Sequence, residues 1–262
     1  LRPIWLTKTE TAKRVQTRIE KVMDWATVKE HRSGDNPARW KGNLEELFTK
    51  PSQIKKINNN GEERHHPAMP YKELATFWGK LSKKNSDPKK KVNLSAKALQ
   101  FLILTACRSG EVLNATWDEI DLEGGLWVIP ARRMKAGKEH RVPLTEPMIE
   151  VLESLPRLSE YVFPGQGAGR PLSGMAMLML MRKMEFGHYV PHGFRSSFRD
   201  WAEEQANYPI RVVEKALAHT VKSAVERAYQ RGDLFDKRRL LMESWGNYLD
   251  RKSTRLNSSH LY

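Results

Sequence analysis

Apolar residues recur three and four positions apart over most of the chain, which is the spacing of one face of an α-helix. The spacing is clear over residues 7–31, where Lys and Arg occupy the opposite face. Thr7 and Glu10 stand three apart, as in a capping box, and predict that this helix begins near Thr7. The apolar positions of the predicted helix are Ala12, Val15, Ile19, Val22, Met23 and Ala26.

Most of the remaining chain also favours helices. Residues 93–106 are apolar nearly all round, so this segment is predicted to be a buried, central helix. Two short β-rich runs, residues 126–130 and 140–144, flank the glycine-containing stretch "ARRMKAGKE" and predict a hairpin. The predicted fold is therefore mainly α with a small antiparallel β-sheet. Other helices are expected at residues 71–81, 145–155, 173–185, 193–205, 210–218 and 235–249.

The pattern divides the chain into two folded parts and a tail. Apolar spacing lapses through "KKINNNGEERHHP", so residues 55–67 are predicted to link a small helical part, 1–54, to a larger one, 68–250. His65 and His66 belong to this linker and are not expected to bind a metal, because adjacent side chains point in different directions. Residues 251–262 lack apolar helical spacing and are expected to be disordered or foreign sequence.

Charge narrows the class of partner. The 262 residues carry a formal charge of +14 with a pI of about 9.8, while 39% are hydrophobic, so a real core can coexist with a strongly basic surface. A polyanion is expected to bind, and nucleic acid is favoured over a membrane because no apolar run approaches the roughly 20 residues of a bilayer span. Cys107 is the single cysteine, which excludes an internal disulfide and fits a reducing cytoplasm. Its place beside a buried helix favours a small core residue over a redox switch.

A set of candidate chemical residues runs along the larger part. Taken singly each has an ordinary structural explanation, but the set as a whole combines cations, proton carriers and one nucleophile in a basic chain. "TACRSGEV" contains an arginine and a glutamate three apart, and "PHGFRSSF" places a histidine and an arginine on one face of a helix start. In chain order the candidates are Arg108, Glu111, Lys135, His192, Arg195, His219 and Tyr229.

This ordered set resembles the tyrosine recombinase (phage integrase) family, whose catalytic residues run Arg, Lys, His-x-x-Arg, His, Tyr. The stretches "HHPAMPY" and "AYQRGDLFDKRRLLMESWGNYL" are also similar to integrases of prophages and genomic islands. The resemblance implies that residues 1–54 are part of a core-binding domain that clamps DNA, and that residues 68–250 are an α-helical catalytic domain with a small antiparallel sheet. The family's arm-binding domain and first core-binding helices have no counterpart, so the chain is expected to be truncated at its N-terminus.

The resemblance also implies roles. Arg108 and Arg195 would bind the scissile phosphate, and Tyr229 would attack it to form a 3′-phosphotyrosine ester. His192 would be a base or proton relay, His219 a hydrogen-bond donor in the transition state, and Lys135 the acid for the departing 5′ oxygen, with Lys138 or a histidine as the alternative. Glu111 would orient Arg108 through a salt bridge or merely cap a turn. The chemistry agrees, because guanidinium groups can neutralise phosphate charge without a metal ion.

Partners follow from the same resemblance. Double-stranded DNA with attachment sites is the expected substrate, bound by a homotetramer that exchanges strands through a Holliday junction, with possible DNA-bending or directionality factors. No cofactor, metal ion or membrane is expected, and the expected location is the bacterial cytoplasm, associated with the nucleoid. Two alternatives are a catalytically inactive DNA-binding remnant of a prophage and a topoisomerase of type IB that relaxes a single duplex.

Overall fold

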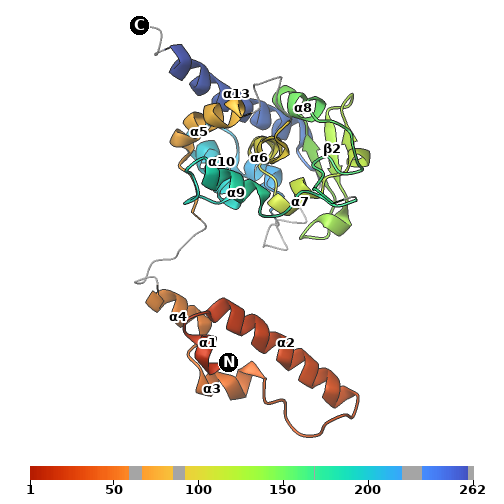
Figure 1. Cartoon of the computed structure of the whole chain (residues 1–262), viewed down its shortest axis with the longest axis vertical. Helices are drawn as coiled ribbons and strands as arrows, with labels where there is room; N and C mark the ends of the chain where they lie inside the picture. Colours follow the sequence, from red (N-terminus) through yellow and green to blue (C-terminus); the bar gives the residue numbers. More distant parts are fainter. Residues whose placement is uncertain (59–66, 85–91, 168, 220–231, 259–262) are drawn as a thin grey trace. The chain divides into compact units, whose positions relative to one another are not determined.

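The chain folds into two units. The computed structural model describes residues 1–58, 67–84, 92–167, 169–219 and 232–258. The units are Leu1–His65 and His66–Tyr262 (Figure 1). Their boundary falls within the linker expected at residues 55–67.

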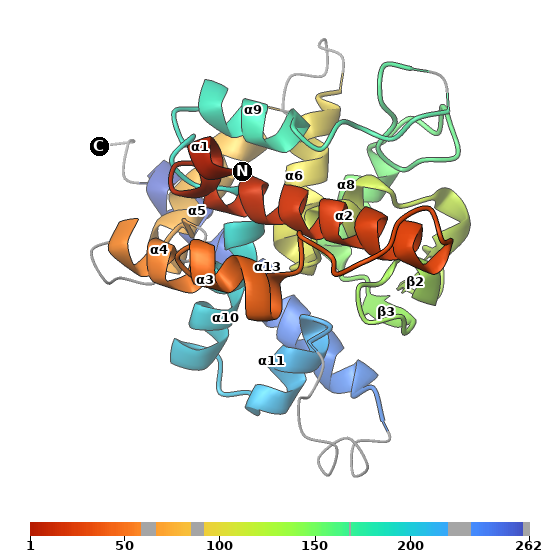
Figure 2. The ribbon, with the colours of Figure 1, turned by 90° about the horizontal axis from the view of Figure 1, so that it is seen from below.

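The first unit is built around one long helix, α2 (Thr9–Val28), with short helical segments beside it (Figure 2). Its small core joins Trp5, Ala12 and Ile54. The Trp5 ring stacks on Trp40 at a centroid distance of 5.4 Å, and its Nε1 donates to the carbonyl of Thr49 at 2.9 Å. The short segments are α1 (Arg2–Trp5), α3 (Glu45–Leu47) and α4 (Pro51–Asn58), and α3 is preceded by a turn, Trp40–Leu44, whose backbone is not helical at Lys41 and Gly42.

Two sequence expectations for this unit were wrong in detail. The capping box does not form: Lys8 is the N-cap of α2, and the Thr7 hydroxyl instead lies 3.5 Å from the Pro3 carbonyl of the unpredicted helix α1. That earlier turn of helix draws Thr7 into a short connection. In addition, α4 continues through Asn58, four residues into the predicted linker, because no glycine or proline interrupts it and the buried Ile54 anchors it.

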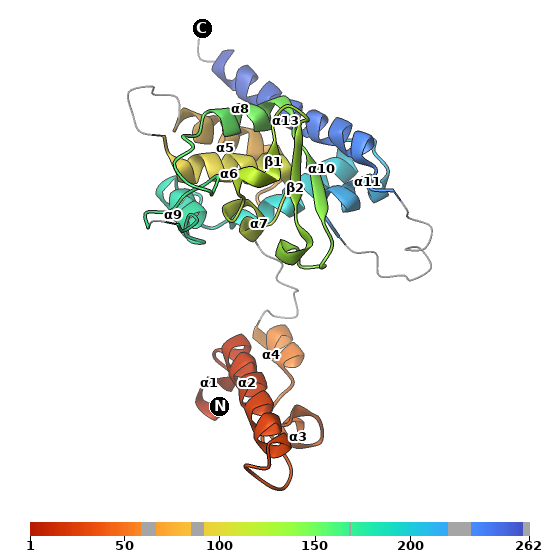
Figure 3. The same ribbon diagram turned by 90° about the vertical axis from the view of Figure 1, so that its right-hand side faces the viewer.

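The second unit surrounds one buried helix, as predicted. Helix α6 (Leu94–Thr105) lies in its middle in both Figure 1 and Figure 3. The Asn93 side chain caps it by accepting from the backbone nitrogen of Ala96, and nine of its residues are buried. The helices around it are α5 (Tyr71–Lys83), α7 (Ser109–Leu113), α8 (Glu146–Glu153), α9 (Ala176–Lys183), α10 (Phe194–Glu204), α11 (Ile210–Ala216) and α13 (Phe235–Ser258).

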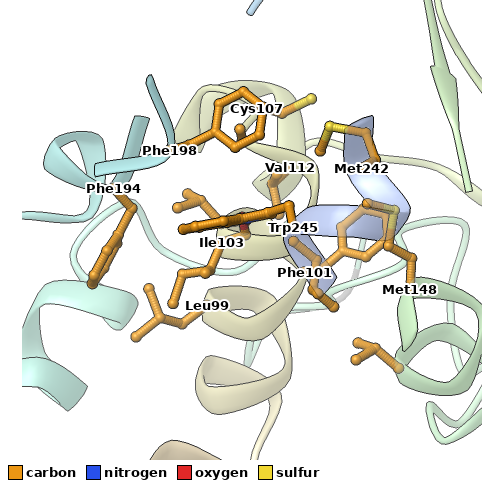
Figure 4. Close-up of a cluster of buried hydrophobic side chains, with 14 of the residues drawn as sticks. Leu99, Phe101, Ile103, Cys107, Val112, Met148, Phe194, Phe198, Met242 and Trp245 are labelled. Carbon is orange, nitrogen blue, oxygen red and sulfur yellow. The ribbon is translucent and has the colours of Figure 1, made fainter. Parts of the chain in front are cut away.

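Aromatic and sulfur-containing side chains fill the space around α6 (Figure 4). Trp245 of α13 is fully buried, and its Nε1 donates to the backbone carbonyl of Ile103 at 2.8 Å. Phe198 of α10 meets the Trp245 ring edge to face at 5.5 Å. Cys107 is also buried here, and burial raises the pKa of its thiol to about 12, so the prediction of a core cysteine agrees with its surroundings.

The small sheet is antiparallel, with the strand order β1 (Ile120–Asp121), β2 (Leu126–Ile129), β3 (His140–Pro143). Ile129 pairs with His140, which confirms the predicted hairpin and places residues 130–139 in its connecting loop. The loop contains a 3-10 turn, Ala131–Arg133, and two further 3-10 turns occur at Trp117–Glu119 and Pro191–Gly193. The mainly α fold with a small antiparallel sheet is confirmed.

Helix α13 is longer than predicted. Its backbone stays helical through Ser258, so of the two alternatives for the tail, disorder was wrong for residues 251–258, while a foreign origin stays a prediction. The reason is that no glycine or proline follows Leu249 in this stretch, and extending an existing helix needs only one further residue to be ordered for each hydrogen bond gained. None of the described helices has both the length and the apolar character of a membrane span.

Candidate active site

Arg108 stands where the central helix ends and α7 begins. The backbone turns at Ala106, whose φ of +50° is a left-handed conformation that costs an L-residue roughly 1–2 kcal/mol. Arg108 is the N-cap of α7, and its Nη1 lies 2.7 Å from Glu111 Oε1. The second oxygen of Glu111 accepts from the Arg108 backbone nitrogen at 2.8 Å. The predicted salt bridge is confirmed, and the same carboxylate also caps the helix.

Arg195 occupies the buried side of the same region. It lies on α10, is 6% exposed, and donates to the carbonyls of Ala106 and Leu217, each at 2.5 Å. Burial lowers the pKa of Arg195, and the nearby charge of Arg108 lowers it further. A guanidinium nevertheless stays protonated in proteins, so two positive charges are held at one place.

His219 follows α11 and lies between an arginine and a glutamate. Its Nε2 is 3.2 Å from Arg195 Nη2, and its Nδ1 is 2.7 Å from Glu214 Oε2. Guanidinium nitrogens only donate, so Nε2 accepts and Nδ1 carries the proton that faces Glu214. Arg199 Nε lies 3.2 Å from the other Glu214 oxygen, at ion-pair distance but without hydrogen-bond geometry.

A second left-handed alanine brings the two arginines onto the same segment. Ala218 has a φ of +49°, and its carbonyl is 3.4 Å from Arg108 Nη2. Arg195 bonds the preceding carbonyl, that of Leu217. The segment that leads into His219 is therefore held by both predicted phosphate ligands, which come from elements far apart in the sequence.

The remaining predicted residues lie outside these contacts or outside the described part of the chain. Lys135 is exposed in the hairpin loop, and its neighbours Met134 and Ala136 line a pocket of about 320 Å³ that His219 and Lys138, the alternative acid, also line. His192 is exposed in the 3-10 turn one helical turn before Arg195. Tyr229 lies outside the described residues, so its role stays a prediction from the sequence.

Three residues near the site carried no sequence signal. Glu214 precedes His219 by five residues, a spacing that marks no motif, yet its carboxylate contacts the imidazole. Arg133 bonds the backbone of Glu111, which is 22 residues away. His140 begins β3 and lines the same pocket as His219.

His140 is held neutral inside the protein. Burial, and after it the charge of Arg238, lower the pKa of its imidazole to about 4. A hydrogen bond to the Ala216 carbonyl opposes the shift, while Arg195 and Arg108 add smaller lowering effects. Strand β3 therefore contacts the end of α11 through an uncharged side chain.

We expect this histidine to make stability depend on pH. As the pH falls from 6.5 to 4, the unfolded chain protonates His140 and the folded chain does not, so the free energy of unfolding falls over this window. Above pH 6.5 His140 is neutral in both states and does not change the free energy of unfolding. At pH 5 the loss is about 2 kcal/mol relative to pH 7.5. Urea unfolding at both pH values should show that the free energy of unfolding falls less between pH 7.5 and pH 5 in His140→Gln than in the unaltered chain. His188→Gln, on an exposed histidine, is the control, and equal losses in all three proteins would contradict the prediction.

The arrangement combines fixed positive charge with a histidine whose orientation is set by a carboxylate. Arg108 keeps 25% of its side chain exposed, so a phosphate oxygen has access to its guanidinium. Among the described residues, no group of three His, Cys, Asp or Glu side chains is arranged to hold a metal ion. Two guanidinium groups at one place can bind a phosphate group and neutralise charge that develops on its non-bridging oxygens.

Comparison with known proteins agrees with this fold. The Phage integrase family matches residues 71–233, and the Phage integrase central domain matches residues 1–43. The chain therefore belongs to the phage integrase family, whose members are the tyrosine recombinases.

Individual relatives agree with this membership. A prophage integrase IntA of Escherichia coli K12 is 35% identical over 162 residues, covering 60% of this chain and 39% of the relative. The integrase of enterobacteria phage P4 is 28% identical over 263 residues, covering 93% of this chain and 56% of the relative. The chain thus spans about half the length of these curated relatives.

Solved structures share the fold. A lambda integrase tetramer bound to a Holliday junction superposes with a TM-score of 0.52 at 15% identity, covering 83% of this chain and 61% of that one. A lambda integrase dimer bound to a core site gives a TM-score of 0.51, also at 15% identity, with coverage of 86% and 60%. At this identity the likeness establishes the fold.

Proposed function

We propose that this chain is the core-binding and catalytic part of a site-specific DNA recombinase that integrates or excises a mobile element. The observation that carries the proposal is the convergence of Arg108, Arg195 and His219. Arg195 donates to the carbonyl of Leu217 and Arg108 to that of Ala218, and Arg195 also contacts the imidazole. A phosphate bound by the arginines would lie next to His219. Membership of the family supports the same reading.

The proposed reaction exchanges one phosphate ester for another. The phenolate of Tyr229 attacks the scissile phosphorus, and the bond to the 5′ oxygen breaks. Lys135 protonates that departing oxygen, and the 3′ phosphate remains on the tyrosine. Because the ester stores the bond energy, the reverse attack by a 5′ hydroxyl rejoins DNA without ATP. His192 is proposed to accept or relay the tyrosine proton.

His219 needs a change of hydrogen bonding to act as a donor. In the absence of DNA its Nε2 accepts from Arg195, so it has no proton to offer a phosphate there. When the phosphate engages Arg195, Nε2 is released and can take up a proton, while Glu214 keeps the ring oriented through Nδ1. We therefore assign Glu214 the role of positioning His219.

The proposed substrate is duplex DNA with attachment sites, which the charge of +14 supports. Unit 1 would contribute part of the clamp on DNA through its core-binding segment at residues 1–54, joined through residues 55–67 to a catalytic domain at residues 68–250. A tetramer on two sites, with DNA-bending or directionality factors, would complete the reaction. The proposed location is the bacterial cytoplasm, associated with the nucleoid.

The test of this function is a covalent adduct. Incubation with nicked DNA that carries a candidate attachment core, in excess EDTA, should give a protein–DNA band on a denaturing gel, because fixed arginines replace metal charge in the chemical step. Omitting EDTA and adding Mg²⁺ is the matched control and should not raise the adduct yield. A strict Mg²⁺ requirement, or no adduct on any core sequence, would contradict the proposal.

Two alternatives give different outcomes in the same assay. An inactive remnant would bind the DNA without forming an adduct. A type IB topoisomerase would relax supercoiled plasmid as a monomer and would not recombine two sites. The contacts that join Arg108, Glu111, Arg195 and His219 favour an active site over a decayed one.

A further inference from the structure

A half-buried arginine lies two residues before the proposed leaving-group acid. Arg133 ends the 3-10 turn Ala131–Arg133 at the base of the hairpin loop, and only 15% of its side chain is exposed. Its Nη1 donates to a carboxylate oxygen of Glu119, and its Nη2 donates to the backbone carbonyl of Glu111. Both contacts hold the loop to the elements between α6 and β1.

The carboxylate that receives Arg133 is itself held in place. Glu119 has 6% of its side chain exposed, and its Oε2 also accepts from Nε1 of the fully buried Trp127 at 3.1 Å. An ion pair in such surroundings adds little net stability, since desolvation offsets much of the attraction between the charges. Its hydrogen bonds are directional, so its main effect is to fix orientation.

Glu111 connects this pair to the phosphate site. Its carboxylate holds Arg108 through two hydrogen bonds, and its backbone carbonyl accepts from Arg133. One residue of α7 is therefore bonded both to a proposed phosphate ligand and to the hairpin. The loop is fixed against the same short helix that orients Arg108.

The backbone of Lys135 can move only a short distance relative to Arg133. Met134 is 6% exposed and packs in the main core, so the backbone is anchored up to the residue before Lys135. Two residues span at most about 7 Å. Lys135 follows directly, and its own side chain is exposed, so its position depends on how the backbone is held at these two residues.

We propose that Arg133 is a positioning residue that sets Lys135 relative to the phosphate bound by Arg108, acting through Glu119 and Glu111. The inference rests on the proposed function, in which Lys135 protonates the 5′ oxygen. A purely structural Arg133 would slow the reaction whichever atom departs, whereas a positioning Arg133 matters only when the departing atom needs a proton.

The experiment compares two DNA substrates, one with the natural 5′ oxygen and one with sulfur at that bridging position, which leaves without protonation. Single-turnover cleavage at saturating DNA is measured for the unaltered chain, Arg133→Gln and Lys135→Ala. A misplaced catalytic group costs roughly 10²-fold, and loss of a general acid about 10²- to 10⁴-fold. We expect both variants to be slow on oxygen DNA and to come within a few-fold of the unaltered chain on sulfur DNA.

Arg132→Gln is the matched control, because Arg132 is the exposed neighbour in the same turn. Its cleavage rate at saturating DNA should stay within a few-fold of the unaltered chain on both substrates. If Arg133→Gln unfolds in a thermal melt, Glu119→Gln weakens the same pair from the other side while keeping side-chain volume, and is measured in its place.

The outcomes separate the inference from the function on which it rests. If sulfur rescues Lys135→Ala but not Arg133→Gln, Arg133 does not act through the lysine and the inference fails while the role of Lys135 stands. If sulfur rescues neither variant, Lys135 is not the acid, and the inference falls with that assignment. Rescue of both, with Arg132→Gln unaffected, is the result that supports it.

Discussion

Tyr229→Phe is expected to abolish the covalent protein–DNA adduct while folding and duplex binding persist. The substitution removes the attacking oxygen and leaves the ring, so no phosphate ester can form at this position. The assignment of Tyr229 as the nucleophile rests on its position, ten residues after His219 in an arginine-rich stretch. A denaturing gel with nicked core-site DNA measures the adduct, and thermal melting with salt-dependent binding checks folding and affinity.

Tyr208→Phe is the control for this experiment. Its hydroxyl contacts the Ser244 hydroxyl at 3.1 Å, away from the Arg108, Arg195 and His219 contacts, so adduct yield should match that of the unaltered chain. An adduct that persists in Tyr229→Phe, mapped by mass spectrometry to another residue, would overturn the assignment of the nucleophile.

Arg195→Ala is expected to reduce both stability and cleavage. The backbone carbonyls of Ala106 and Leu217 belong to buried residues and both lose this donor. An unsatisfied buried polar group costs about 1–3 kcal/mol, so the combined loss in the free energy of unfolding should be about 2–6 kcal/mol. Loss of a charge-stabilising donor adds roughly a 10²- to 10³-fold fall in cleavage rate.

Arg195→Lys separates the two effects. It keeps the positive charge but lacks the guanidinium fork, so one ammonium cannot reproduce both carbonyl bonds and the contact with His219. We expect milder destabilisation and a cleavage rate still reduced by about 10²-fold, measured below the melting temperature. Arg211→Lys, on an exposed arginine of α11, should change neither quantity. Cleavage by Arg195→Lys at the unaltered rate would remove Arg195 from the phosphate site.

The local pattern of apolar and polar residues was sufficient to predict the main helices and the hairpin of the second unit. Residues 93–106 are apolar nearly all round, and a helix with such a surface is buried by the elements around it, as nine of the 12 residues of α6 are. The hairpin was equally predictable, because β-rich runs flank a loop that contains glycine, and Ile129 pairs with His140. The ends of elements were less predictable, since Thr7 has the spacing of a cap yet a preceding turn of helix displaces it.

The sequence by itself predicted the class of chemistry, because the order of Arg108, Lys135, His192, Arg195, His219 and Tyr229 resembles that of the tyrosine recombinases, which implies phosphate transfer on DNA. Only the tertiary structure decided which groups meet. Arg108 reaches a carbonyl 110 residues away and Arg195 one 89 residues away, through turns at two left-handed alanines that no local propensity favours. The partly buried contacts of Arg133 with Glu119 and Glu111 also depend on packing, because hydrogen bonds between distant segments form only after the helices and the hairpin have been brought together around α6.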